Sequence, residues 1–242
     1  DVVPLVELNR AFVRSGMKVI EMKSNIGIKS LIEISNISKP LKTNHLGFII
    51  GPKINAGGRL GFSMLGVELL IENNQNKANK IAQTLDSLNE NRKILEYEMT
   101  EKAYEKIKNN QFKNNFIWVA DKEFKSGITG IIASRILDKF GKTCFVISID
   151  KDKIGKGSGR SNPHHNLGNA INQLAQENLI IKGGGHAKAA GITVEAAKID
   201  IAMNRLNIIL SEQEEITNEL STLNINSVIS INAISSNFIQ DM

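Results

Sequence analysis

The chain has 242 residues, of which 30 are basic and 25 acidic, so its formal net charge is +5 and its pI is near 9.2. Hydrophobic residues make up 41% and charged residues 23%, which is typical of globular proteins and excludes a disordered or collagen-like chain. A single cysteine, Cys144, excludes a disulfide framework and a cysteine-cluster metal site. The modest positive charge allows an anionic partner without requiring one.

The length allows one large domain or two ordinary ones. No run of eighteen apolar residues occurs, and the N-terminus lacks a signal pattern, so we expect a cytoplasmic protein without a membrane span. The chain begins at Asp1 rather than at a methionine, and we expect it to be a piece of a longer protein.

The first half of the chain is predicted to be mainly helical, beginning with residues 1–39. Residues 47–61 are rich in glycine, which favours an irregular backbone over the interior of a helix. Residues 74–110 contain neither glycine nor proline and carry an apolar stripe at helical spacing. This pattern predicts one or two long helices that link two domains. The stripe consists of Ile81, Leu85, Leu88, Leu95 and Met99.

After residue 115 the pattern changes to alternating strands and helices. Strands are predicted at 116–120, 144–149 and 192–195, and helices at 127–140, 167–176 and 199–211. Gly141 ends the first of these helices, as a C-terminal glycine commonly does. The strand–helix–strand order predicts two parallel strands with a right-handed crossover. The tail from residue 212 has alternating apolar residues and is predicted to open another, truncated domain with a strand.

The run GKGSGRS at residues 155–161 has the chemistry of a phosphate-binding segment. Alternating glycines can turn successive amides toward a ligand and let it approach closely. Ser158 offers a hydroxyl donor, Arg160 a planar fork that fits two phosphate oxygens, and Lys156 a point charge. A glycine-rich hairpin with solvated charges explains the run equally well. The order and spacing differ from those of a P-loop.

A second run, GGGHAKAAG at residues 183–191, points to the same chemistry. Three successive glycines cost conformational entropy, so a folded protein that keeps them is expected to need the bare backbone. The amides of Gly184 and Gly185 can face an anion, and His186 can donate to a phosphate or act as an acid or base. Arg59 also lies in a glycine-rich segment, but its spacing alone favours an ordinary exposed side chain.

Catalytic groups are scarce in this sequence. Phosphodiester hydrolysis usually needs clustered carboxylates that hold one or two divalent metals. Beyond Asp1, the aspartates are scattered singly, and the pair His164–His165 has no evident metal-binding partner. Trp118 lies in an apolar strand and is expected to be a core residue rather than a base-stacking platform. The residues present in this chain therefore predict that it binds phosphate but does not cleave a phosphodiester.

Five segments together resemble the RecJ family, single-strand-specific 5′→3′ DNA exonucleases of the DHH phosphoesterase superfamily. In chain order they are DVVPL (1–5), GPKINAGGRLG (51–61), GITGIIASRI (127–136), GKGSGRS (155–161) and GGGHAKAAG (183–191). The last two resemble the hallmarks of the DHH-associated domain. The resemblance covers nearly the whole chain. Departures include Lys53 for the usual Arg, Gly57 for Ala, and Lys125 where the family often has His.

The resemblance implies an α/β fold with the end of a DHH domain, a long linker helix, and a mixed-sheet DHH-associated domain with helices on its faces. The implied boundaries are 1–73 for the DHH remnant, 74–113 for the linker helix, 114–211 for the DHH-associated domain and 212–242 for the start of an OB-like domain. It also implies that Asp1 is a metal ligand, that Arg59, Ser158 and Arg160 bind the terminal 5′-phosphate, and that His186 contacts substrate. Two Mn²⁺ or Mg²⁺ ions would bind in the parent DHH domain.

The resemblance therefore implies the substrate-binding part of an exonuclease used in DNA repair and recombination, inactive as a fragment because most metal ligands are absent. Its expected partner is single-stranded DNA with a 5′ end, with helicases or single-strand-binding proteins as further partners, and a monomer is expected. Two alternatives remain. One is an oligoribonuclease or cyclic-dinucleotide phosphodiesterase of the same superfamily, and the other is a non-catalytic nucleic-acid-binding module.

Overall fold

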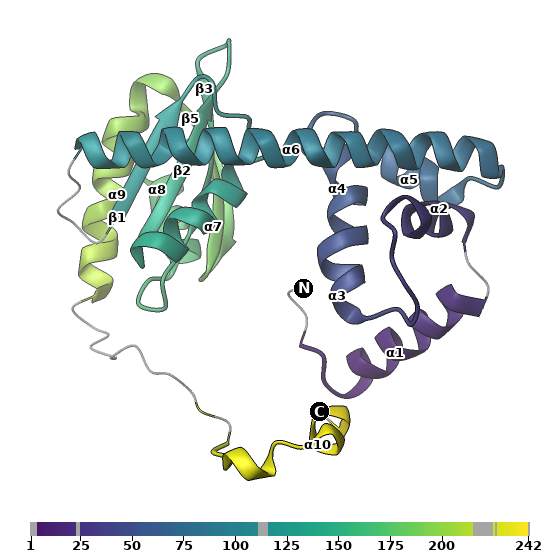
Figure 1. The fold of residues 1–242 in the computed structure, drawn as a ribbon. Coiled ribbons are helices and arrows are strands. Elements are labelled where there is room, and N and C mark those ends of the chain that lie inside the picture. Colours follow the sequence, from purple (N-terminus) through teal and green to yellow (C-terminus); the bar gives the residue numbers. More distant parts are fainter. Residues whose placement is uncertain (1–3, 23–24, 111–115, 215–224, 226, 242) are drawn as a thin grey trace.

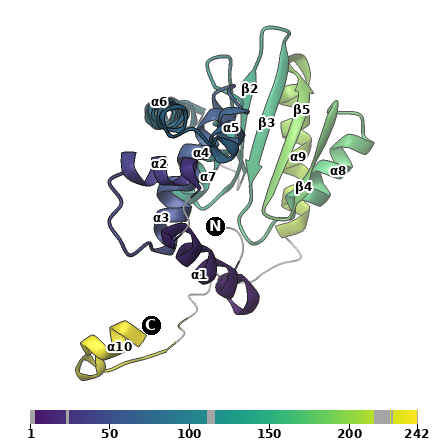
Figure 2. The same cartoon turned by 90° about the vertical axis from the view of Figure 1, so that its right-hand side faces the viewer.

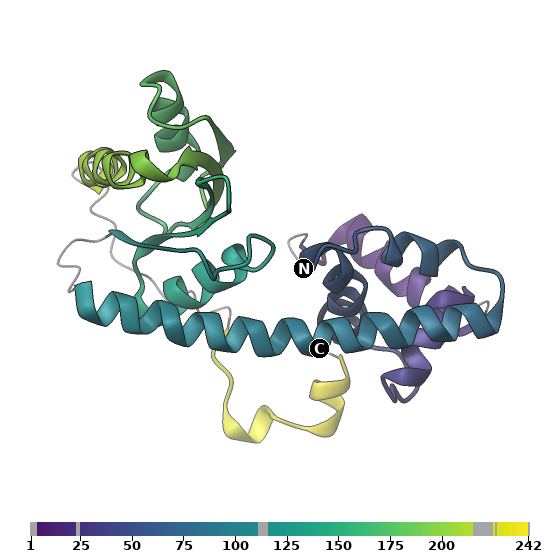
Figure 3. The ribbon, with the colours of Figure 1, turned by 90° about the horizontal axis from the view of Figure 1, so that it is seen from above.

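A computed structural model describes residues 4–22, 25–110, 116–214, 225 and 227–241. One helix, α6 (Gln75–Asn110), runs across the whole molecule and carries a lobe near each end (Figure 1). Seen from above, the C-terminal lobe and most of the N-terminal lobe lie on the same side of this helix (Figure 3). The prediction of a long linking helix over residues 74–110 is confirmed, and the segment forms one helix rather than two.

The described residues of the N-terminal lobe form helices joined by turns and loops, and they contain no strand. Its elements are α1 (Glu7–Met22), α2 (Ile26–Ile34), α3 (Thr43–His45), the π-helical turn η1 (Leu46–Ile50), α4 (Gly51–Arg59) and α5 (Leu65–Ile71). Helices α2, α4 and α5 pack on the first half of α6. Their shared core contains Leu31, Ile50, Leu69, Ala78, Ala82 and Leu85.

The glycine-rich segment 47–61 is helical, so the prediction of an irregular backbone was wrong there. Its glycines serve close packing instead. A Cβ atom on Gly57 would lie 2.6 Å from the backbone oxygen of Phe62, where the chain turns back after α4. Lys53 on the same helix is buried and pairs with Asp86 of α6 at 2.5 Å. Helix α4 is thereby held close against the long helix.

The C-terminal lobe contains a five-stranded sheet in the order β1-β2-β3-β5-β4. The strands are β1 (Phe116–Asp121), β2 (Thr143–Ile149), β3 (Ile154–Arg160), β4 (Lys182–His186) and β5 (Ala189–Glu195). Strands β1 and β2 are parallel and joined through α7 (Thr129–Phe140), which confirms the predicted crossover unit. The other neighbours are antiparallel. Gly141 ends α7 with φ of 66°.

Helices cover the two faces of the sheet unequally (Figure 2). Helices α8 (Leu167–Gln176) and α9 (Ile199–Glu214), the latter after the short 3-10 turn η2 (Ala196–Lys198), pack on one face around Phe145, Ile147 and Ile192. Helix α7 and the second half of α6 pack on the other face, against Ile117, Val119, Cys144 and Val146. Their contacts reach β1, β2 and β3. Among the described helices, none packs on the same face of β5 and β4, which is therefore called the open face.

The C-terminal segment does not form the strand that its alternating apolar residues predict. The described residues 227–241 contain a 3-10 turn, η3 (Ile231–Ala233), and a short helix, α10 (Ser236–Asp241). Val228, Ile231 and Ile234 are exposed there, so alternation is not matched by a buried sheet face. Among the described residues, no helix is long and apolar enough to cross a membrane.

Candidate phosphate-binding site

Arg59 ends helix α4 and lies where the two lobes meet. Its Nη1 donates a hydrogen bond to the Gly127 carbonyl oxygen at 3.1 Å. A Cβ atom on Gly127 would overlap the backbone carbonyl of Arg59, so only glycine allows this approach. The neighbouring Leu60 packs against the core of the C-terminal lobe. The last turn of α4 is therefore fixed beside the loop that leads into α7.

Ser158 and Arg160 reach the same place from strand β3. The Ser158 hydroxyl lies 3.2 Å from that of Thr129, at the first residue of α7. The Arg160 Nη2 atom lies against Gly130, 3.1 Å from where a Cβ would stand, and Nη1 donates to the Gly159 carbonyl at 2.9 Å. The N-terminus of this 12-residue helix carries a positive partial charge. A helix N-terminus, a hydroxyl and two guanidinium groups thus converge there, which suits a phosphate.

Two further arginines and one carboxylate support this cluster. Glu96 of α6 accepts from Arg92 at 2.6 Å and from Arg135 of α7 at 3.1 Å. Partial burial lowers the pKa of Arg59, the nearby Arg92 and Arg160 lower it further, and Glu96 raises it. Arg59 remains charged, because an arginine pKa stays far above neutrality. Glu96 therefore offsets the repulsion within a cluster of arginines.

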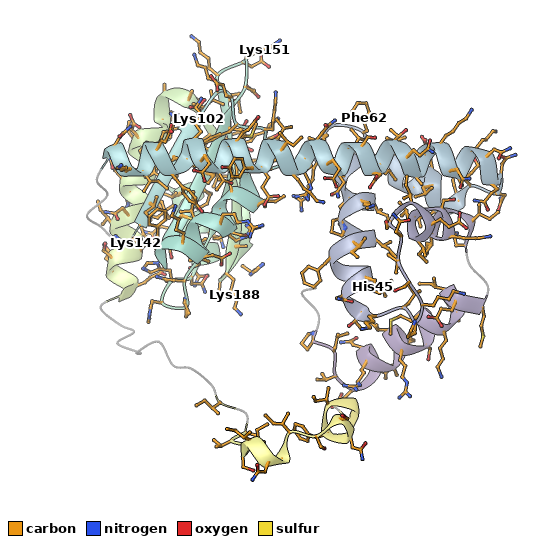
Figure 4. The ribbon with its side chains drawn as sticks, in the orientation of Figure 1. His45, Phe62, Lys102, Lys142, Lys151 and Lys188 are labelled. Carbon is orange, nitrogen blue, oxygen red and sulfur yellow. The ribbon has the colours of Figure 1, made fainter. Side chains whose placement is uncertain are left out.

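The GGGH run forms strand β4, at the edge of the sheet, rather than a loop around an anion. In the pairing register, His186 lies opposite Ala189, and Ala189 lies opposite Arg160. Residues directly opposite point to the same face, so His186 shares the open face with Arg160. Its Nδ1 accepts from the Lys188 amide at 3.3 Å, so the ring proton is on Nε2, which can act as a donor. Lys188 extends from this end of the lobe, below α7 (Figure 4).

The three glycines of this strand have different environments. A Cβ on Gly185 would lie 2.5 Å from the Ala190 Cα, and one on Gly183 would lie 2.5 Å from the Ile171 side chain. A Cβ on Gly184 would meet nothing within 4 Å. Packing therefore accounts for Gly183 and Gly185 but leaves Gly184 unexplained by the fold.

The glycines of GKGSGRS also have a packing role. Gly155, Gly157 and Gly159 face the core beneath α8 and α9, and their added Cβ atoms would press on Ile147, Ile192 and Phe145. The segment is a regular central strand with no left-handed glycine. The idea that these glycines turn successive amides toward a ligand was therefore wrong. They place Lys156, Ser158 and Arg160 on the opposite, open face.

Other residues singled out in the sequence lie elsewhere. His165 is buried and its Nδ1 lies 2.6 Å from the Thr143 hydroxyl, which gives it a structural role. Trp118 packs at the margin of the core under α9, as expected for a core residue. Sequence reasoning missed Arg92, Glu96 and Arg135. The i, i+4 spacing of Arg92 and Glu96 was visible, but the contact to α7 depends on the tertiary fold.

The described residues do not form a metal centre. Among them, no group of three or more His, Cys, Asp or Glu side chains is placed to hold a metal ion. Asp1, the one predicted metal ligand, lies outside the described residues. The described residues therefore do not fit a two-metal site.

The fold agrees with what comparisons with known proteins show. Residues 109–212 match the DHHA1 domain family. The single-stranded-DNA-specific exonuclease RecJ of Salmonella typhimurium is 36% identical over 220 residues, covering 88% of this chain and 38% of the relative. RecJ of Bacillus subtilis is 31% identical, covering 86% of this chain and 26% of the relative.

Solved structures extend the match to three dimensions. The crystal structure of RecJ in complex with Mn²⁺ from Thermus thermophilus superposes with a TM-score of 0.77 at 29% identity, over 88% of this chain and 31% of that chain. A crystal structure of exonuclease RecJ bound to manganese gives a TM-score of 0.72 at 30% identity, over 87% of this chain and 52% of that chain.

The molecule is thus a mixed α/β protein in which a long helix joins a helical lobe to a lobe that is similar to the DHHA1 domain. More particularly, it is RecJ-like over most of its length, and the resemblance read from the motifs is confirmed. The chain spans about two fifths or less of the length of the curated RecJ relatives described above.

Proposed function

We propose that this chain is the substrate-binding part of a single-strand-specific 5′→3′ DNA exonuclease, and that it holds the terminal 5′-phosphate of the strand. The observation that carries the proposal is the convergence of Arg59, Ser158 and Arg160 at the N-terminus of α7. These residues come from both lobes and from segments far apart in the sequence. The relatives' name, single-stranded-DNA-specific exonuclease, supports the choice of polymer and reaction.

The proposed roles follow from the chemistry of each group. Arg160 and Arg59 present planar forks that can each engage two phosphate oxygens, and Ser158 donates a hydroxyl hydrogen bond. The positive end of α7 attracts the second negative charge that a terminal phosphate monoester carries and an internal diester lacks. This difference in charge would make the site selective for a 5′ end. His186, with its ring on the same sheet face, would donate to the strand beyond that phosphate.

Hydrolysis is assigned to the parent protein rather than to the described residues. A divalent metal, as bound in the RecJ crystal structures, would supply an activated water when present in the parent. We therefore expect the purified chain to bind single strands weakly and to leave them intact in the presence of Mn²⁺. Clear metal-dependent digestion from the 5′ end by the purified chain would contradict this assignment.

The binding proposal is tested with Arg160→Ala and two oligonucleotides that differ only in a 5′-phosphate or 5′-hydroxyl. Loss of a charge-assisted, two-point contact should weaken binding of the phosphorylated strand about 10- to 100-fold, with little change for the hydroxyl strand. Arg205→Ala is the matched control, because Arg205 pairs with Glu177 on the side of α8 and α9. Equal losses on both strands would remove Arg160 from the end-binding role. Tighter binding of a cyclic dinucleotide than of the phosphorylated strand would favour the oligonucleotide-hydrolase alternative.

A further inference from the structure

A shallow hollow lies on the open face of the sheet, next to the proposed terminal-phosphate site. It encloses about 430 Å³. Its polar lining includes Ser126, Lys156, Lys182 and Thr193, and its remaining lining is Gly157, Gly183, Gly184, Gly191 and Ile192. Of these polar side chains, only Lys156 is a phosphate ligand predicted from the sequence.

The sheet register arranges these side chains in order. Arg160, Ala189 and His186 form one row across β3, β5 and β4, and Ser158, Gly191 and Gly184 form the next. Lys156, Thr193 and Lys182 form the third row on the same face. Adjacent rows are two residues apart, or about 6.6 Å along a strand. The third row therefore continues the basic surface by roughly the distance between neighbouring phosphates of an extended strand.

The third row also has the composition of an anion site. Two lysines, on strands either side of β5, flank the Thr193 hydroxyl, and neighbouring strands are about 4.8 Å apart. Both lysines are exposed, and the Lys156 ammonium is 4.0 Å from the Asp150 carboxylate. Ser126, at the rim, precedes α7 and lies near the first site. One phosphate between the two ammonium groups would reduce their mutual repulsion.

The glycines in the second row leave room for such a ligand, and the fold does not require them. A Cβ on Gly184 would meet no atom within 4 Å, and one on Gly191 would make only an ordinary contact of 3.7 Å with the Gly157 oxygen. A side chain at either position would stand between the Ser158–Arg160 site and the lysine row. Because residues 184 and 191 have no side chains, a continuous path of bare backbone joins the Ser158–Arg160 site to the lysine row.

We propose that Lys156, Thr193 and Lys182 form a second phosphate subsite, adjacent to the terminal-phosphate site. The inference rests on the proposed function, because the first site anchors the ligand that reaches the second. The second phosphate can come from the next phosphodiester of the strand or from a 5′-polyphosphate. Both sources present the same oxygen chemistry at about the same reach.

The test measures binding of three deoxynucleotide ligands to the full chain. A nucleoside 5′-monophosphate offers only the first phosphate. A 5′-phosphorylated dinucleotide adds a phosphodiester, and a nucleoside 5′-triphosphate adds a polyphosphate. Lys182→Ala should leave monophosphate affinity unchanged and weaken one of the other two ligands several-fold at low salt. For that ligand the loss should shrink as salt is added, because the lost contact is between two charged, exposed groups. The ligand that responds identifies the source.

Lys151→Ala is the matched control, because Lys151 projects from the loop between β2 and β3, away from the rest of the lobe (Figure 4). Lys156→Ala should behave like Lys182→Ala. If Lys182→Ala and Lys151→Ala give the same affinities for all three ligands, the second subsite is refuted. If Arg160→Ala also leaves every affinity unchanged, the terminal-phosphate site itself fails. A loss with Arg160→Ala alone refutes only the second subsite.

Discussion

Two adjacent glycines on strand β4 allow a test of whether the absence of a side chain serves packing or ligand binding. Gly184→Ala adds a methyl group in open space on the exposed sheet face. Gly185→Ala adds the same group on the opposite face, 2.5 Å from the Ala190 Cα and against the backbone of β5. The chemistry of the two substitutions is identical, and only the direction of the new atom differs.

The expected effects on stability have opposite signs. Gly184→Ala restricts the unfolded chain without a clash and should raise the free energy of unfolding by about 0.4–1 kcal/mol. Gly185→Ala forces two paired strands apart, because the obstructing atoms are backbone and cannot rotate away. Overpacking of this kind costs about 1–3 kcal/mol, and we expect the upper end of that range. For a chain of this size, 3 kcal/mol corresponds to a melting temperature lower by roughly 6–12 °C.

The expected effects on binding separate the roles further. Gly184→Ala should weaken binding of a 5′-phosphorylated strand even though the folded protein is more stable than before. Thermal melting and fluorescence anisotropy on the same samples measure both quantities. A Gly184→Ala variant with unchanged affinity would show that the open backbone at this position serves no ligand. A Gly185→Ala variant as stable as the parent would refute the packing argument.

Two further predictions concern a half-buried carboxylate and a buried thiol in the C-terminal lobe. Burial opposes ionisation of Asp121, but hydrogen bonds from Lys106, the Glu123 amide and Lys102 outweigh it and lower the pKa of Asp121 to about 2. A lowered carboxyl pKa stabilises the folded state above the unfolded pKa. We therefore expect Asp121→Asn to lower the free energy of unfolding by about 2 kcal/mol at pH 7, and this difference should disappear as the pH falls from about 4 to 2. Urea titrations at several pH values measure it. A difference that does not change with pH would contradict this origin. Burial raises the pKa of Cys144 to about 12, so its thiol should react with a disulfide reagent at pH 8 only after unfolding, and rapid labelling of the native protein would disprove it.

Much of the C-terminal lobe could be predicted because its signals are local. The apolar run of β2, the helix ended by Gly141 and the polar helix α6 each carry their own pattern. The prediction for the glycine-rich segment 47–61 was wrong, because glycine occurs both in irregular turns and in places where backbones approach closely. Gly57 and Gly27 are of the second kind, since their added Cβ atoms would run into backbone atoms of Phe62 and Leu69. Sequence alone does not distinguish these two uses.

The candidate site was predictable as a set of residues but not as an arrangement. Ser158 and Arg160 stood out because serine and arginine alternate with glycine. The reason given for those glycines was wrong, since they fit under the core while the polar side chains face outward. The spacing around Arg59 was only weak evidence for a binding role. Its importance comes from the place where α4 ends. Glu96 and Arg135 gain meaning only through a contact between two helices.

The contact between Arg59 and Gly127 links the arrangement of the lobes to the chemistry of the site. The Arg59 carbonyl occupies the space that a side chain at residue 127 would need, while its guanidinium donates to the carbonyl of that same residue. Both interactions fix how closely the end of α4 approaches the start of α7. Because Ser158 and Arg160 are already held at that end of α7, this distance also decides whether Arg59 can share one phosphate with them. The proposed site therefore depends on the spacing of the two lobes as well as on the identities of its three side chains.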